Sequence, residues 1–306
     1  FAIDTLGKLW AWGLNTSNQL GDGSATTRLA PVQIGTGTTW QSVAAHGSGG
    51  FATLTTGALN AWGFNSSGQV GDNTLTSRSA PVVIGGTTDW SGAALAAGSG
   101  HCIVRKTNGT LWTWGANTLG QLGQGFADNA ARANTPLQVG TASNWAVVAG
   151  GVGVSHAATS DGSVYSWGTN TNNIHGVVMR SLLPLSQQLG AVSSAVGSTN
   201  NTYFIKPDGT LWGLGGNGSG QLGLGVVDSS QHPTPVPMGT GFTWLSVSSA
   251  NSSMHAIRSD HTLWACGSNS SGQLGDGTIT TRTSLIQIGT DADWNFIFDA
   301  NNCTYA

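Results

Sequence analysis

Three histidines are the residues of this sequence whose spacing could support metal chemistry. His156 and His255 stand at the same place in a repeating pattern, and His101 lies two residues before the corresponding place. Zinc would need their ring nitrogens to converge at about 2 Å from the metal. His156 and His255 belong to repeats that are two apart, however, and no pattern of carboxylates accompanies them. We therefore expect these side chains to pack and hydrogen-bond in the interior, with no metal and no other cofactor.

The acidic residues indicate turns more strongly than calcium loops or catalysis. Asp22-Gly23, Asp72-Asn73 and Asp276-Gly277 supply one carboxylate per repeat, whereas calcium takes about six to eight oxygens. No Gly-x-Ser-x-Gly segment joins a strand to a helix, and the glycine-rich Gly98–Gly100 precedes no helix that could bind a phosphate. The sequence therefore predicts no catalytic residues, and we expect a protein that is not an enzyme.

The secondary-structure elements that would position a functional site follow a sequence repeat. Six hairpins end in glycine, usually as Trp-Gly. All six are followed by Asn, and five then carry Gln-Leu-Gly or Gln-Val-Gly. The steps between these glycines are 50, 52, 53, 47 and 52 residues, for Gly13, Gly63, Gly115, Gly168, Gly215 and Gly267. A fixed period in this range indicates modules that bury their apolar faces only against a neighbour.

Each repeat contains four segments that resemble short β-strands. An apolar segment such as Phe51–Thr53 comes first, and a two-residue turn such as Asn108-Gly109 leads to an alternating strand such as Leu111–Trp114. A short third strand is expected at the Gln-Leu pair, as in Gln121-Leu122, and a fourth at Leu137–Val139 and its counterparts. Proline at or near the start of the fourth segment is typical of a sheet edge, because proline has no N–H for the ladder.

Four short antiparallel strands in six repeats, without helical periodicity, predict an all-β fold: a β-propeller of six four-stranded blades. We expect a single domain over residues 1–306. The next glycine of the series would fall at position 319, which is 306 residues after Gly13. The N- and C-terminal segments are therefore expected to share a blade. A seventh blade outside this sequence, or an excerpt from a longer array, would fit the same phase.

The thirteen tryptophans fall on three repeat positions, which favours blade packing over a carbohydrate-binding platform. Packed in this way, each indole would bury on the order of 150–250 Å². The first position holds Trp40, Trp90, Trp145, Trp244 and Trp294, the second Trp10, Trp112, Trp212 and Trp264, and the third Trp12, Trp62, Trp114 and Trp167. The asparagine that follows the closing glycine, as in Asn65, recurs in every repeat and is expected to cap a turn.

Composition excludes several classes of partner. Only 8% of the residues are charged, the net charge is −3, and no run of Lys or Arg occurs, so we expect no nucleic-acid partner. No stretch approaches the roughly 18–20 apolar residues that cross a bilayer, so no membrane insertion is expected. Cys102, Cys266 and Cys303 stand at different repeat positions, which is not the pattern of a disulfide framework.

The segment Leu111–Gly125 reads Leu-Trp-x-Trp-Gly-x-Asn-x-x-Gly-Gln-Leu-Gly-x-Gly, and Leu263–Gly277 matches it with Cys266 at the second tryptophan. This motif resembles the repeat of the regulator-of-chromosome-condensation (RCC1) family. Six in-phase copies extend the resemblance over essentially the whole chain, although Asn173–Gly176 departs from it. The family typically forms seven-bladed propellers, and the resemblance implies functions that include exchange on small GTPases, inhibition of secreted enzymes, and binding on bacterial or viral surfaces. The low charge looks most like bacterial and phage versions.

Candidate binding residues lie in the loops before the first apolar segment of each repeat. These loops differ in length and content and should crowd one rim of the ring, where recognition residues concentrate. The expected set is His46, Ser48, Ser99, His101, Val152, Val154, Asn200, Asn201, Asn251, Ser252, Asn301 and Asn302. The longer outer segments Phe126–Asn134 and Val226–Pro235 form a second candidate surface.

These features predict a non-catalytic interaction or adhesion module on an extracellular, cell-surface or virion structure. Its ligand would be a protein or a glycan, and assembly into a larger structure is a further expectation. The alternative is a regulator that binds a globular protein, either a GTPase exchange factor or an inhibitor of a secreted enzyme. A lectin is the third hypothesis.

Overall fold

The computed structural model describes residues 1–125, 132–169, 181–187, 192–198, 201–250, 252–295, 297–300 and 303–305. In these segments all regular structure is β-strand. No helix among the described residues has the length and apolar character that crossing a bilayer requires. The chain divides into two compact units: Phe1–Ala157 with Trp167–Thr169 and Leu182–Pro184, and Ala158–Ser166 with Asn170–Ser181 and Leu185–Ala306. The expected single domain remains a prediction.

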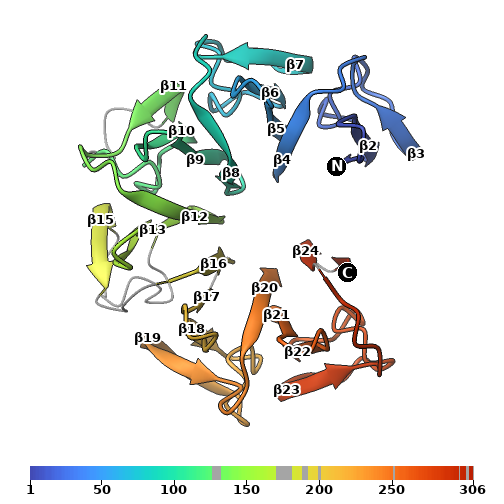
Figure 1. Ribbon diagram of the computed structural model, residues 1–306, viewed down its shortest axis with the longest axis vertical. Helices are drawn as coiled ribbons and strands as arrows, with labels where there is room; N and C mark the ends of the chain where they lie inside the picture. Colours follow the sequence, from blue (N-terminus) through green and yellow to red (C-terminus); the bar gives the residue numbers. More distant parts are fainter. Residues whose placement is uncertain are drawn as a thin grey trace. The chain divides into compact units, whose positions relative to one another are not determined.

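Three antiparallel sheets make up most of the first unit (Figure 1). The first contains β1 (Ala2–Ile3), β2 (Leu9–Gly13) and β3 (Arg28–Gln33) in that order. The second contains β4 (Trp40–His46), β5 (Gly49–Leu54), β6 (Leu59–Gly63) and β7 (Arg78–Ile84), and the third contains β8 (Trp90–Ala97), β9 (His101–Lys106), β10 (Leu111–Ala116) and β11 (Arg132–Gln138).

The remaining sheets follow the same order. The fourth contains β12 (Trp145–Gly151), β13 (Val154–Thr159), β14 (Val164–Gly168) and β15 (Ser181–Gln187). The fifth contains β16 (Ser194–Gly197), β17 (Asn201–Ile205), β18 (Leu211–Asn217) and β19 (Asp228–Met238), and the sixth β20 (Trp244–Ala250), β21 (Ser253–Arg258), β22 (Leu263–Gly267) and β23 (Arg282–Ile288). A final pair contains β24 (Phe298–Ala300) and β25 (Cys303–Tyr305).

The strands differ from the sequence prediction at one place in five of the six repeats. The Gln-Leu pairs are turns instead of third strands, at Gln19–Leu20, Gln69–Val70, Gln121–Leu122, Gln221–Leu222 and Gln273–Leu274. The reason is local: the Oδ1 atom of Asn15 accepts a hydrogen bond from the Leu20 amide at 3.0 Å, and the other repeats copy this contact. The missing strand lies upstream, in segments such as Trp40–His46, and forms the first strand of its sheet.

Packing between sheets explains why the second strands are buried on both faces. In the second sheet Phe51 pairs with Ala44 on β4 and with Ala61 on β6. Phe51 also packs with Val104 and Trp114 of the third sheet in one apolar cluster. In the second unit, Tyr203 of β17 clusters with Met254 of β21 in the same manner. First strands of successive sheets are neighbours, β4 with β8 and β8 with β12 in the first unit, and β16 with β20 in the second.

Candidate functional site

The turn between the first and second strands of a sheet is hydrogen-bonded to the residue at the end of its third strand or just after it. The amide of Phe64 donates to the Ser48 carbonyl at 2.9 Å, and the amide of Ala116 donates to the Gly100 carbonyl at 2.8 Å. Thr169 and Ser268 repeat the bond, to Gly153 and Ser252. The turn and the end of the third strand therefore present their side chains together at one end of each sheet.

Adjacent turns in the first unit are close enough to form a continuous surface. A Cβ placed on Gly47 would lie 2.8 Å from the Ser99 carbonyl oxygen, so the second and third sheets nearly touch there. Apolar side chains are exposed beside these turns: Phe64 by 40%, Leu119 by 38% and Val152 by 48%. We call this surface, made of Ser48, Phe64, Ser99, Leu119 and Val152, the hairpin rim.

The predicted binding residues divide into three groups. Ser99 and Val152 are exposed, and Ser48 and Ser252 are half-buried, so these four can meet a partner. His46, His101, Val154 and Asn201 are buried, which corrects their assignment as contact residues. They occupy strand ends whose side chains point into the sheet packing instead of the loop surface. Asn200, Asn251, Asn301 and Asn302 lie outside the described residues.

The sequence prediction missed Phe64 and Leu119. Phe64 occupies the variable position of the Trp-Gly-x-Asn motif, which holds Leu14 in the first repeat and Ala116 in the third. Leu14 is also exposed, by 62%. A bulky apolar residue at a position where other repeats have small or polar ones was the available signal. Of the second candidate surface, residues 126–131 lie outside the described part, while Val226 and Val227 are exposed.

Burial keeps His46 and His101 in their neutral form. Neither ring nitrogen of His46 has a hydrogen-bond partner, and burial lowers its pKa to about 4. His101 Nε2 lies 2.8 Å from Ser155 Oγ, which donates to the Gln121 carbonyl at 2.7 Å. Burial likewise lowers the pKa of His101 to about 4. His156 and His255 are buried in second strands, and no three His, Cys, Asp or Glu residues of the described segments gather as a metal site.

The recurring asparagine organises an outer network, as predicted, and also recruits the aspartate. Asn65 accepts from the Val70 amide at 2.9 Å and donates to the Thr74 and Thr76 carbonyls. Asp72 then accepts from Arg78 Nε at 2.6 Å. In the sixth sheet burial acts to raise the pKa of Asp276, but hydrogen bonds from Thr278, Arg282 and Asn269 outweigh it and lower that pKa to about 2. Each of these carboxylates therefore stabilises the turn of its own repeat.

The tryptophans at the third repeat position are packed as predicted, with one exception. Trp62, Trp114 and Trp167 are completely buried, and each indole N–H donates to a carbonyl of the preceding repeat at 2.9–3.0 Å. Trp12 is 43% exposed, so its burial was predicted wrongly. These three indoles therefore hold neighbouring sheets together.

Models of the regulator of chromosome condensation (RCC1) repeat match residues 7–52, 93–121, 108–158 and 208–257, together more than half of the chain. The ultraviolet-B receptor UVR8 of Arabidopsis thaliana is 27% identical over 199 residues, which cover 63% of this chain and 45% of UVR8. The human probable E3 ubiquitin-protein ligase HERC6 is 31% identical over 201 residues, covering 59% of this chain and 19% of HERC6. This chain thus spans less than half the length of either relative.

Solved structures agree with the repeat match. Prp20p from Saccharomyces cerevisiae, described with its binding properties to Gsp1p and histones, superposes with a TM-score of 0.85 at 19% identity, over 98% of this chain and 78% of that one. Human WBSCR16 gives 0.82 at 18% identity, over 94% and 78%. The fold is a β-propeller, and the six repeats form six sheets of three or four strands in the described segments. A blade shared by the two termini remains a prediction. This chain belongs to the family of proteins built from RCC1 repeats.

Proposed function

We propose that this chain is a non-catalytic, protein-binding module with a regulatory role, and that its partner docks on the hairpin rim. This proposal rests on the solvent exposure of the apolar side chains of Phe64, Leu119 and Val152, which lie on adjoining turns. Exposed apolar side chains gathered on rigid loops are typical of protein interaction sites. The rim requires no movement of the strands, so a partner would meet a preformed surface.

The relatives favour regulation over adhesion. UVR8 is named a receptor, and Prp20p is described with Gsp1p, histones and Kap60, which are all proteins. The ligase in the name of HERC6 is not attributed to this chain, which covers 19% of that protein. An extracellular, cell-surface or virion location stays a prediction, as do a glycan bound at the rim and assembly into a larger structure.

Site-specific photo-crosslinking tests the rim directly. A crosslinking side chain placed at Ser48 or Ser99 should capture the partner, whereas one at Ser143 should not. Ser143 is exposed, and its carbonyl lies over Gly109, at the turn between the second and third strands and hence at the opposite end of the sheet. The probes are histones and a panel of small GTPases. Equal capture from Ser143 would remove the rim from consideration.

Charge insertion supplies the matched binding measurement. Phe64→Asp and Val152→Asp should each weaken binding of the captured partner by about tenfold or more, because a buried carboxylate would lose its hydration. Ser143→Asp should leave affinity unchanged. If that partner is a GTPase, its rate of nucleotide release with and without this protein distinguishes an exchange factor from a plain binder.

A further inference from the structure

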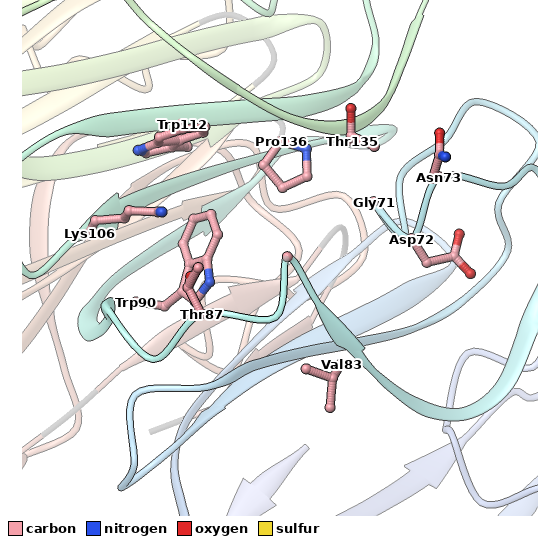
Figure 2. A pocket seen from close by; sticks show the side chains of 11 residues that line it. Gly71, Asp72, Asn73, Val83, Thr87, Trp90, Lys106, Trp112, Thr135 and Pro136 are labelled. Atoms are coloured by element: carbon pink, nitrogen blue, oxygen red, sulfur yellow. The ribbon is translucent and has the colours of Figure 1, made fainter.

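A hollow of about 450 Å³ lies between the second and third sheets of the first unit, apart from the hairpin rim. One side of the hollow is formed by the turn at Gly71–Asn73, by Val83 in β7 and by Gly85 just after that strand. The third sheet contributes Trp90, Lys106 and Trp112 (Figure 2). Ligand pockets commonly have volumes of roughly 300–1,000 Å³. The hollow is therefore large enough for one small cyclic molecule.

The aromatic wall is held rigidly. The rings of Trp90 and Trp112 stand edge to face with centroids 6.0 Å apart. The Lys106 ammonium lies 4.6 Å from the first ring centroid and 4.4 Å from the second, and Figure 2 shows it directed between them. Such cation–π contacts fix the indole planes. A ligand would meet this wall without reordering it.

One buried donor on this wall has no partner. Trp90 is 2% exposed, and its Nε1 atom has no hydrogen bond to the described residues. Trp112, by contrast, donates its N–H to Thr110 Oγ1 at 2.9 Å. A buried N–H without an acceptor is costly, so a molecule that brings an oxygen atom to Trp90 would be favoured in the hollow.

The charges around the hollow cancel. Lys106 Nζ lies 3.2 Å from Asp89 Oδ2, and Asp72 is paired with Arg78. An anion would therefore find its cation already compensated, and a cation would find its carboxylates already paired. Asn73 and Thr135 add polar side chains on the other side of the hollow, whereas Thr87, whose hydroxyl donates to Asp89 at 2.6 Å, lies beside Trp90 (Figure 2). The chemistry suits a neutral molecule with one apolar face and several hydroxyl groups.

We propose that this hollow binds one neutral pyranose unit of a glycan. The C–H face of the sugar would stack on the indole wall, and its oxygens would meet the Trp90 N–H and the polar side chains opposite. A proline-containing peptide could also stack on tryptophan, but it would leave the hydroxyl and amide groups of Thr135 and Asn73 without use. A sugar could both stack on the indoles and hydrogen-bond to the polar side chains.

The second unit provides an internal control at the same repeat position. There a hollow of about 390 Å³ is lined by Trp244 and Trp264, and Trp244 Nε1 is likewise buried without a partner. Leu224, Leu285 and Phe242 stand along its walls. The repeat thus builds the indole pair in both units, whereas the polar wall opposite it belongs to the first. Only the first hollow is expected to bind sugar.

The test follows indole N–H signals by two-dimensional NMR while neutral mono- and disaccharides, such as glucose, galactose, mannose and N-acetylglucosamine, are titrated in. The signals of Trp90 and Trp112, assigned by substitution with Phe, should shift and saturate, and those of Trp244 and Trp264 should not. Thr135→Val removes one hydroxyl without changing volume and should weaken binding about fivefold to tenfold, as expected for one lost hydrogen bond. Thr240→Val, its control in the second hollow, should have no effect.

Three results would overturn the proposal. The first is the absence of saturable shifts at Trp90 and Trp112 with every sugar of the panel. The second is equal weakening by Thr135→Val and Thr240→Val. The third is a response to a proline-rich peptide but to no sugar. Phe64→Asp, which changes the hairpin rim, should leave sugar binding intact, so failure of the proposed partner site and failure of this pocket are separately visible.

Discussion

The indole nitrogen of Trp114 donates a 2.9 Å hydrogen bond to the carbonyl oxygen of Gln69, which belongs to the preceding repeat. The ring is fully buried and forms edge contacts with Phe51 and Trp90. One side chain thereby joins two sheets by both packing and a polar bond. The Gln69 carbonyl is free to accept because its segment is a turn and not a strand.

Replacement of this indole should be among the most damaging changes in the first unit. Trp114→Ala is expected to lower the free energy of unfolding by about 3–5 kcal/mol, because it leaves a cavity and removes the indole hydrogen bond to Gln69. Trp12→Ala, at the same repeat position but 43% exposed, should cost about 1 kcal/mol or less. Urea denaturation followed by circular dichroism measures both. Equal costs would contradict the assignment of Trp114 as a packing residue.

The capping asparagine should stabilise the fold through several hydrogen bonds that one substitution removes together. Asn65→Ala removes an acceptor for the Val70 amide and donors to two carbonyls, and should cost about 2–3 kcal/mol of unfolding free energy. Asn144→Ala, at an exposed loop position, should be neutral within about 0.5 kcal/mol. Chemical denaturation again gives the measurement. A cost for Asn65→Ala no larger than the control would show that solvent replaces the network.

Two glycines at the same repeat position allow the cost of a positive φ to be measured separately from the cost of a steric clash. Gly63 and Gly13 have the same positive φ, 102° and 103°. A Cβ at Gly63 would collide with Gly49 and the Ser48 carbonyl, whereas one at Gly13 meets nothing within 4 Å. Both alanine variants should lose about 1 kcal/mol from the left-handed backbone, and Gly63→Ala should lose about 1–3 kcal/mol more from the clash. Thermal and chemical unfolding of the two variants compare them, and equal losses would argue against the close approach.

Stability should fall on mild acidification because of the buried histidines. The pKa values of His46 and His101 drop from 6.5 in the unfolded chain to about 4 in the folded one. The unfolded state then binds more protons below pH 6.5, so the stabilisation is complete above that pH and is lost as the pH falls towards 4. Each histidine contributes about 3 kcal/mol to this loss. Unfolding free energies measured between pH 7 and 4 should show the slope.

The variant His46→Phe isolates one of the two contributions. Phenylalanine keeps an aromatic ring beside Gly49 but cannot bind a proton, so the slope of stability against pH should become shallower by roughly half. An unchanged slope would mean that His46 already reaches water in the folded state.

The two buried thiols should be unreactive until the protein unfolds. Burial raises the pKa of Cys266 to about 12 and that of Cys102 further, and the thiolate is the reactive form. In a Cys303→Ser background, a disulfide reagent such as dithionitrobenzoate should label neither thiol in buffer and both in denaturant. Fast labelling in buffer would show that the third or sixth sheet opens readily.

The hairpins, the edge strands with proline and the capping asparagines are local features, and the sequence predicts them correctly. The first strand, as at Trp40–His46, is not visible in this way, because its mixed polar and apolar residues lack clean alternation. The Gln-Leu pair offered a competing strand, yet Asn15 and its equivalents use that backbone in a turn.

The inward direction of His46 and His101 could not be read from strand assignment alone. Each ring lies against a glycine: a Cβ on Gly49 would lie 2.6 Å from the His46 ring, and one on Gly98 would overlap His101. The same separation of three residues between glycine and histidine occurs in both repeats. Such pairing of a small and a large residue across a turn was the available clue. The exposed rim depends on which turns adjoin, which is a matter of tertiary packing.

The indole bonds that join neighbouring sheets at the third repeat position of the first unit run in one sense along the polypeptide, from Trp62 to Gln19, from Trp114 to Gln69 and from Trp167 to Gln121. The acceptor always precedes the donor by one repeat. During translation, each emerging module therefore finds its docking carbonyl in a module that has already left the ribosome. These indole hydrogen bonds can therefore form in the order in which the repeats are synthesised.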